Sequence, residues 1–321
     1  MQQPPYQISF SQTLNKDNLE NIDKENDVLK ITSKIIPLPF NADTFILTPC
    51  AIMPKGSCIT IEIKFFKGPS KTQWLKYLHI EKNNNLSFNE KNELGHFDTD
   101  IFKAAEYIDS FKYRITAKGK VSFNSLNCVI TKHKALFDLE AATEQADQPS
   151  VILNIKPISQ IQHGFERKNR ICSPTCIAMA LDYFGISSSL QETVDGVYDK
   201  KADTYGNWVF NASYAGLYGL ENAVIRCDTV KQAQNIVSAG IPLIASISFK
   251  EGELKSAPQK ETPGHLVLIK GFTKQGDFIV NDPGAETDAQ VEKIYDKTEF
   301  AAAWLKNKKG LCYKISKQKG T

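Results

Sequence analysis

The sequence has no hydrophobic run that could cross a bilayer, since none approaches the ~20 consecutive apolar residues of a membrane-spanning helix. It has no marked excess of charge either, because 39 basic residues face 36 acidic ones. A chain this balanced does not predict binding to nucleic acid or to an anionic membrane surface. The N-terminus, MQQPPYQISFSQ, lacks the basic and then apolar segments of a signal peptide. We expect no transmembrane segment and no nucleic-acid partner.

Cysteine is scarce and scattered. The seven cysteines lie far apart and are odd in number, whereas a secreted protein held by disulfides usually has more of them and an even count. The sequence predicts no disulfide framework and leaves the cellular compartment open.

The length of 321 residues predicts two domains, because single hydrophobic cores seldom grow beyond about 250–300 residues. Residues 29–134 contain β-branched and aromatic runs separated by turn residues, which predict an antiparallel β-sandwich. The runs are residues 43–50, 58–66, 72–81, 111–119 and 126–132. Residues 1–28 are polar and predict a flexible N-terminal segment, and residues 135–150 predict a linker.

Residues 151–321 have a different pattern, with helices first and an antiparallel sheet last. Residues 150–162 predict a strand, followed by a helix with Ser173 as N-cap, Pro174 at its first position and Gly185 at its end. A second helix is expected over 229–240, and later strands over 241–249, 264–272, 277–283 and 310–315. We expect an α+β domain.

The stretch RICSPTCIAMALDYFG, residues 170–185, places a cysteine directly before an apolar helix. The positive end of the helix dipole favours a thiolate at Cys172, and Arg170 adds positive charge nearby. A thiolate is a strong nucleophile, but acyl transfer also needs a base. Because a cysteine at a helix start is more often structural than catalytic, this stretch alone leaves both interpretations open.

His265 is the best candidate for that base. It opens the strand 264–272, so the sheet would fix its backbone, whereas His163 lies in a polar loop. Asp282 follows the next hairpin and could hold the imidazole in one tautomer. A two-residue turn would pair Asp282 with Ile269, which lies about 13 Å along the strand from His265. The assignment therefore requires a bulge, a longer turn or a strong twist.

An oxyanion hole would need a donor besides the backbone N–H of Cys172. A glutamine amide could supply it, and Gln160 and Gln162 both precede the cysteine on one face of the predicted strand. The residues alone do not choose between them.

Five segments occur in the order of a known family. They are CSPTCIAMALDYFG, GNWVFNASYAGLYGLENAVIR, AGIPLIASISF, GHLVLIKGFTKQGDFIVNDP and VEKIYDKTEFAAAWL. Together they resemble the bacterial papain-like cysteine peptidases of family thirty-nine, named after bacteriocin-processing, double-glycine leader peptidases. The resemblance is strongest to the stand-alone branch without a transporter and covers residues 155–316. That branch often carries an N-terminal β-sandwich, so the resemblance implies a papain-like peptidase domain preceded by a sandwich.

The resemblance implies roles for four residues. Cys172 would be the nucleophile, His265 the base and Asp282 the orienting carboxylate. Gln160 would serve the oxyanion hole, because it follows a serine as in the stand-alone branch. The leader peptidases hold this glutamine nearer the cysteine, where this chain has Glu166.

Three further residues are candidates for substrate binding. The family's counterpart of GNWVFN implies that Asn207 and Trp208 line the cleft, and Gly264 lies beside the proposed base. Cys176 stands where the branch commonly has serine. We expect it to be a packed free thiol rather than half of a strained disulfide or a metal ligand, because zinc needs four ligands. No metal and no cofactor are expected.

The implied function is a cysteine peptidase or amidohydrolase that cleaves a peptide or isopeptide bond through a thioacyl-enzyme at Cys172. Two alternatives stay open. The first is an acyltransferase, because transglutaminases and arylamine acyltransferases use the same chain order of Cys, His and Asp. The second is a binding protein whose peptidase domain has lost its activity and whose sandwich recognises a glycan or another cell-envelope ligand. Relatives with this architecture are often exported, so the resemblance favours the envelope or the exterior.

Overall fold

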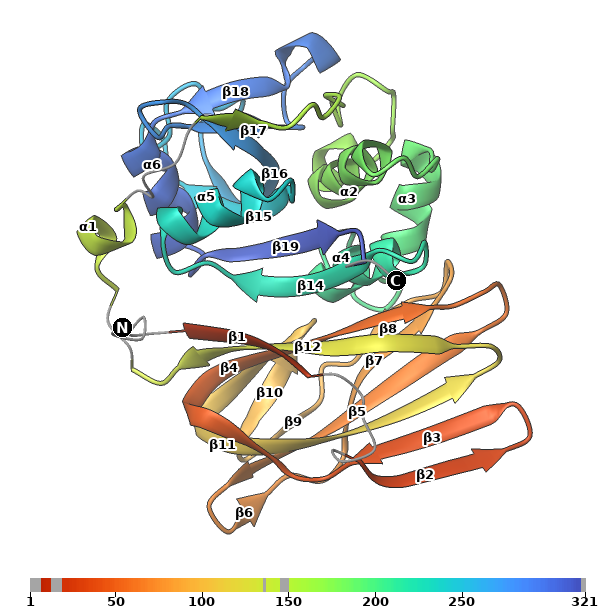
Figure 1. Ribbon diagram of the computed structural model, residues 1–321. Coiled ribbons are helices and arrows are strands. Elements are labelled where there is room, and N and C mark those ends of the chain that lie inside the picture. The colour runs from red at the N-terminus through yellow and green to blue at the C-terminus, as the bar shows by residue number, and fades with distance from the viewer. Residues whose placement is uncertain (1–6, 13–18, 135–136, 145–149, 319–321) are drawn as a thin grey trace. The chain divides into compact units, whose positions relative to one another are not determined.

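A computed structural model describes residues 7–12, 19–134, 137–144 and 150–318 (Figure 1). The chain divides into two compact units. Unit 1 comprises Met1–Leu136 and Gly196–Gly219, and unit 2 comprises Phe137–Asp195 and Leu220–Thr321. Within the described ranges, no helix is both long and apolar enough to span a membrane.

Unit 1 is built on antiparallel strands in one hydrogen-bonded network, whose main path is β1-β12-β4-β11-β5-β7-β8. The long strands β4 and β11 pair with each other through two shifts of register. The strands are β1 (Gln7–Gln12), β2 (Leu19–Glu25), β3 (Val28–Ser33), β4 (Ile36–Ile52), β5 (Cys58–Lys67), β6 (Ser70–Lys71), β7 (Leu75–Glu81), β8 (Leu86–Ser87), β9 (Lys91–Asn92), β10 (Gly95–Asp98), β11 (Ile101–Lys118) and β12 (Ser122–Lys132).

The core of unit 1 lies on one face of these strands. Along β5, Ile61 and Ile63 are fully buried and alternate with partly exposed residues, which is the period-two pattern of a half-buried strand. Aromatic rings fill the interior: Phe45 meets Phe65 edge-on at 5.1 Å between ring centroids, and Phe65 stacks on Phe102 at 3.9 Å. The predicted all-β first half is confirmed.

The N-terminal segment differs from the flexible one predicted over residues 1–28. β1 pairs with β12, and β2 pairs with β3. Pairing at a strand edge needs only backbone hydrogen bonds, so the polar composition of this segment does not prevent it. Residues 1–6 and 13–18 of that prediction lie outside the described residues. In the predicted linker, α1 (Leu139–Ala142) is a short helix, and residues 135–136 and 145–149 are likewise outside the description.

Gly196–Gly219 comes from the second half of the sequence but belongs to unit 1. Its helix α4 (Trp208–Gly216) packs on β4, where the Ser213 hydroxyl donates to the Pro49 carbonyl at 3.1 Å. The compact units therefore do not follow the boundary predicted near residue 150, because a segment of the later sequence packs with the β-strands.

Unit 2 is an α+β structure on a second antiparallel sheet, in the order β14-β19-β15-β16-β17-β18 with β13 beside β16. Its strands are β13 (Val151–Ile152), β14 (Glu221–Arg226), β15 (Leu243–Phe249), β16 (Thr262–Phe272), β17 (Phe278–Asn281), β18 (Glu292–Tyr295) and β19 (Leu311–Ser316). Its helices are the short α1 already described, α2 (Cys172–Tyr183), α5 (Val230–Ser238) and α6 (Lys297–Ala301), with the short turns η2 (Lys168–Arg170) and η3 (Asp288–Gln290) and the π-helical turn η4 (Ala302–Lys306). The remaining helix, α3 (Leu190–Val197), begins in unit 2 and ends in Gly196–Gly219.

Helix α2 begins earlier than predicted. Its first residue is Cys172 and its N-cap is Ile171, whose carbonyl accepts the backbone N–H of Thr175 at 3.0 Å, so Ser173 is not the cap. Pro174 still fits the first turn, because the N–H that proline lacks would have no intrahelical partner there. At the other end, Gly185 adopts a φ of +81° and ends the helix as predicted.

Candidate active site

Cys172 occupies the first position of α2, which packs against β16. Its side chain is half-buried. Because the first N–H groups of a helix point out of its end, a thiolate here lies at the positive end of the helix dipole. The helix thus begins at the cysteine itself, whereas the sequence predicted a start after it.

His265 lies on β16, opposite Ile247 of β15, and only 3% of its side chain is exposed. Its Nε2 lies 2.7 Å from Asp282 Oδ1. The same imidazole interacts with the side chain of Cys172, and this interaction lowers the pKa of the thiol. Since Nε2 faces the carboxylate, Nδ1 is the nitrogen left for the sulfur. The structure thus brings the predicted nucleophile, base and carboxylate together.

Two local irregularities solve the spacing problem between Asp282 and His265. The turn after β16 is longer than two residues, with the Thr273 N–H donating to the Asp277 carbonyl at 3.0 Å. A bulge then shifts the register between Ile269 and Gly271, so that Leu268 pairs with Asn281. The simple pairing of Asp282 with Ile269 is therefore wrong. Together the two irregularities place Asp282 one position beyond the Leu268–Asn281 pair, on the side of His265. Asp282 is therefore nearer to His265 than the ~13 Å along the strand that the simple register implies.

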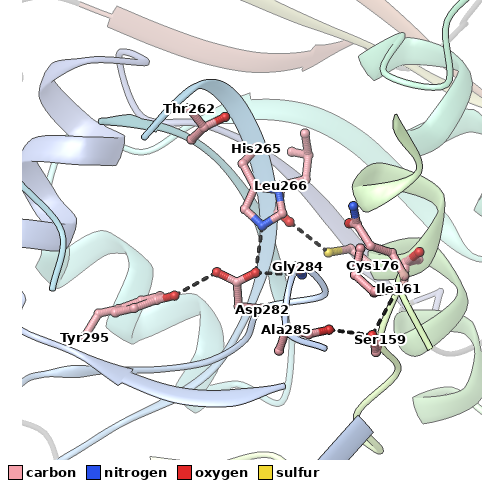
Figure 2. Close-up of polar contacts among 12 residues, drawn as sticks. Ser159, Ile161, Cys176, Thr262, His265, Leu266, Asp282, Gly284, Ala285 and Tyr295 are labelled. Atoms are coloured by element: carbon pink, nitrogen blue, oxygen red, sulfur yellow. Dashed lines mark hydrogen bonds and ion pairs between the residues drawn. The ribbon is translucent and has the colours of Figure 1, made fainter. Parts of the chain in front are cut away.

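Asp282 is held by more than the histidine. Its Oδ1 also accepts the backbone N–H of Gly284 at 2.9 Å, and its Oδ2 accepts the hydroxyl of Tyr295 at 2.7 Å. Figure 2 shows Tyr295, Asp282 and His265 joined in this order. A carboxylate with donors on both oxygens cannot rotate freely, so it presents Oδ1 to the imidazole in one orientation.

The pKa shifts favour a charged pair. Burial alone would raise the pKa of Cys172, but the hydrogen bond and the charge of His265 lower it overall. Burial would lower the pKa of His265, but the charge and hydrogen bond of Asp282, aided by Cys172, raise it overall. For Asp282, the penalty of burial is outweighed by His265, Tyr295 and Gly284, so its pKa falls. These directions stabilise a thiolate beside an imidazolium.

Gln160 is buried, with 2% of its side chain exposed, and its backbone N–H donates to the Pro283 carbonyl at 2.9 Å, one residue from Asp282. Its amide nitrogen donates to the Lys168 carbonyl at 2.8 Å, which leaves a second amide N–H. Gln162 is exposed and accepts the backbone N–H of Asp288 instead. The structure thus separates the two candidates. The predicted strand 150–162 is, however, wrong outside Val151–Ile152, and the segment continues as loop and turns.

Cys176 is fully buried one turn after the nucleophile, and its thiol donates to the Leu266 carbonyl at 3.4 Å (Figure 2). Burial and the negative charges of Cys172 and Asp282 raise its pKa well above the ordinary value. Cys176 forms no disulfide, and its raised pKa favours the protonated thiol. No three His, Cys, Asp or Glu side chains of the described chain are grouped as a metal site requires.

Asn207 and Trp208 belong to unit 1. The Asn207 amide donates to Asp199 at 3.0 Å, and the backbone N–H groups of Trp208 and Val209 donate to the buried carboxylate of Asp100. These contacts hold the start of α4. Gly264 lies on β16 in unit 2 and donates its N–H to Thr262 Oγ1 at 3.2 Å. The roles of Asn207, Trp208 and Gly264 in substrate binding stay predictions.

Sequence reasoning missed Tyr295 and Gly284. Tyr295 ends β18 and pairs with Phe278 at the start of β17, yet its hydroxyl reaches Asp282 beyond the other end of that strand. The alternation in VEKIYDK indicates a strand but not which polar group its tyrosine would meet. The closeness of Gly284 to Asp282 in the DPG turn was a usable signal, because such turns bring an N–H back to the aspartate side chain.

Tyr295→Phe tests whether the hydroxyl positions Asp282. A buried carboxylate that loses a donor is a less stable anion, so its support for the imidazolium weakens. We expect the rate of Cys172 alkylation by iodoacetamide at pH 6 to fall about 10- to 100-fold, as the loss of a hydrogen bond to a charged group implies. Tyr183→Phe is the matched control, because it removes a hydroxyl that donates to the Gly240 carbonyl beyond the far end of α2. Equal rates in both variants would contradict a positioning role.

Comparisons with known proteins match about half of the chain. A family model described as Peptidase_C39 like family matches residues 152–312. A structure described as a C39-like peptidase from Bacillus anthracis is 17% identical, covers 53% of this chain and 99% of its own, and gives a TM-score of 0.39. A double glycine motif protease from an AMS/PCAT transporter, solved with the leader peptide, is 18% identical, covers 53% of this chain and 100% of its own, and gives a TM-score of 0.36. No curated protein matches.

Proposed function

The chain belongs to the Peptidase_C39 like family, and from that premise we propose that it is a cysteine peptidase whose nucleophile is Cys172. His265 is its acid and base, Asp282 orients the imidazole, and Gln160 is the side-chain donor of the oxyanion hole. The substrate class is a peptide or a protein. A glycan or other cell-envelope ligand for unit 1 stays a prediction from the resemblance.

The reaction begins with the thiolate–imidazolium pair. The Cys172 thiolate attacks the carbonyl carbon of the scissile bond, and the oxygen that gains the negative charge accepts hydrogen bonds from the Cys172 N–H and the Gln160 amide. The imidazolium of His265 gives its proton to the leaving amine, which releases one product and leaves a thioester on Cys172. The neutral imidazole then takes a proton from water, whose oxygen attacks the thioester. Collapse of that intermediate releases the acid and restores the thiolate and the imidazolium.

One observation carries the proposal: the buried imidazole of His265 is hydrogen-bonded to the carboxylate of Asp282 at 2.7 Å and interacts with the side chain of Cys172, whose pKa it lowers. A cysteine kept only for packing does not need a buried acid–imidazole pair beside it. The helix end and the ion pair both stabilise the thiolate, which is the requirement for a nucleophile at neutral pH.

The test is the pH profile of iodoacetamide labelling, followed cysteine by cysteine by mass spectrometry. Because the pKa of Cys172 is lowered, its thiolate persists toward acidic pH while an ordinary thiol, with a pKa of about 8.5, is protonated. We expect Cys172 to be labelled rapidly at pH 6. In His265→Ala, Cys172 loses the neighbouring charge that offsets the effect of burial, so the pKa of Cys172 should rise. Labelling at pH 6 should then fall by at least about 100-fold, since each pKa unit changes the thiolate fraction tenfold.

Cys176 supplies the internal control. It lies on the same tryptic peptide, residues 171–200, and its raised pKa predicts no labelling at pH 6 in either protein. Labelling of Cys172 that is as slow as that of Cys176, or that does not change in His265→Ala, would overturn the proposal.

A further inference from the structure

Two cysteines outside the candidate active site lie next to each other in the interior of unit 2. Cys227 directly follows β14, and Cys312 lies in β19. Their sulfur atoms are 3.9 Å apart, and both side chains are fully buried. The two residues are far apart in the sequence, so only the pairing of the two strands brings the thiols together.

The backbone holds this arrangement in register. β14 and β19 pair antiparallel, with Ile225 opposite Cys312, and the pairing continues as the Cys227 N–H donates to the Gly310 carbonyl at 2.9 Å. Gly310 has a φ of +64°, and a Cβ on it would lie 1.8 Å from the Cys227 carbonyl oxygen. Only glycine permits this close approach, so Cys227 is fixed against the turn that leads into β19.

The environment makes the two thiols unreactive in the closed fold. The hydrogen bond to Cys312 and burial raise the pKa of Cys227 well above its ordinary value. Neither sulfur is exposed, so neither meets a soluble oxidant directly. β14 is, however, the edge strand of the sheet, paired with β19 alone on the main path. Opening of this edge, during folding or by fraying, would expose both thiols together.

We propose that Cys227 and Cys312 are a disulfide site, which closes when the chain folds in the presence of an oxidising thiol–disulfide couple. One thiolate attacks glutathione disulfide, forming a mixed disulfide and releasing one glutathione. The second thiolate then displaces the bound glutathione, so that two thiols and one glutathione disulfide become one protein disulfide and two glutathiones. The sulfurs must approach from 3.9 Å to about 2.05 Å, the length of a disulfide bond.

The proposal is independent of the function assigned to Cys172. It predicts that two cysteines far apart in the sequence link the edge strand β14 covalently to its neighbour β19. The sequence pattern of seven cysteines gave no hint of a framework, because the pairing depends on the register of β14 and β19.

Peptide mapping tests the proposal directly. The full chain is refolded in parallel with a glutathione and glutathione disulfide mixture or with dithiothreitol, alkylated under denaturing conditions and digested with trypsin. The two cysteines fall on short separate peptides, residues 227–231 and 310–314. We expect the oxidised sample to yield these peptides linked, with two hydrogens less than their summed mass, and the link to disappear on reduction. Recovery of both peptides singly alkylated from the oxidised sample would overturn the proposal.

Thermal unfolding supplies the second measurement. A disulfide that closes a long loop should raise the Tm of the oxidised protein over the reduced protein by on the order of 10 °C. Cys227→Ser should remove this difference. Cys128→Ser, at an equally buried thiol of unit 1, should keep it. Any glutathione on Cys172 lies on a different peptide, so failure of the disulfide proposal and failure of the proposed function give separate signals.

Discussion

Cys172→Ala is expected to reduce peptide hydrolysis by at least about 10³-fold, because the acyl-enzyme cannot form without the sulfur and removal of a covalent nucleophile costs this much or more. The fold should persist. The side chain is half-buried rather than part of the closed core, and alanine is the best helix former for the start of α2. Turnover is measured by mass spectrometry on a peptide library, and folding by circular dichroism and Tm.

Cys176→Ser is the matched control on the same helix. A serine hydroxyl can still donate to the Leu266 carbonyl, which the thiol reaches at 3.4 Å, so hydrolysis should stay within a few-fold of the unmodified protein. Hydrolysis that survives in Cys172→Ala would mean that another group performs the chemistry. Equal losses in the two variants would mean that α2 tolerates no change and that the assay reports folding.

Asp282→Ala is expected to reduce hydrolysis by about 10²- to 10⁴-fold, the range that follows from loss of the group that sets the histidine tautomer. Without the carboxylate, Nε2 of His265 is buried with no acceptor, and the charge that raises the pKa of His265 is gone. The imidazole would then be neutral at pH 7 and free to turn, and the pKa of Cys172 would rise. The rate of hydrolysis and the pH profile of Cys172 labelling should change together.

Asp282→Asn separates orientation from charge. An amide oxygen in the place of Oδ1 can still accept from His265 and Gly284, and the amide nitrogen can donate to the Tyr295 hydroxyl if that hydroxyl turns. We expect a smaller loss than in Asp282→Ala. An asparagine variant as inactive as the alanine variant would show that the charge matters more than the orientation, and an alanine variant with full activity would remove Asp282 from the site.

Local signals in the sequence predicted the elements that carry the site. The helix after Cys172 and its end at Gly185 follow from residues that act on their own backbone, and the strands follow from alternation. The start of the helix was misplaced because Ser173 looks like a cap, while the structure uses the carbonyl of Ile171.

The distance between Asp282 and His265 could not be predicted from the sequence, because it depends on a bulge that tertiary contacts hold. The bulge falls at Lys270, whose ammonium group is buried and donates to the Ile155 carbonyl at 3.2 Å and to Glu292 at 2.8 Å. Neither partner is a sequence neighbour of the hairpin turn. The place of Gly196–Gly219 was unpredictable for the same reason, since its anchor is the carboxylate of Asp100 in a β-turn of unit 1.

The course of the chain through its two units also bears on how the protein is made. Because Gly196–Gly219 belongs to unit 1 although it interrupts unit 2, neither unit is continuous in the sequence. During synthesis from the N-terminus, the strands of unit 1 leave the ribosome long before α4, which packs on β4, so that unit stays incomplete until Gly219 has emerged. Unit 2 is completed later still, because β19, which lies between β14 and β15, comes last in the sequence among the described strands of that unit. A gene cut at any single position would therefore separate at least one unit from a part of its own fold.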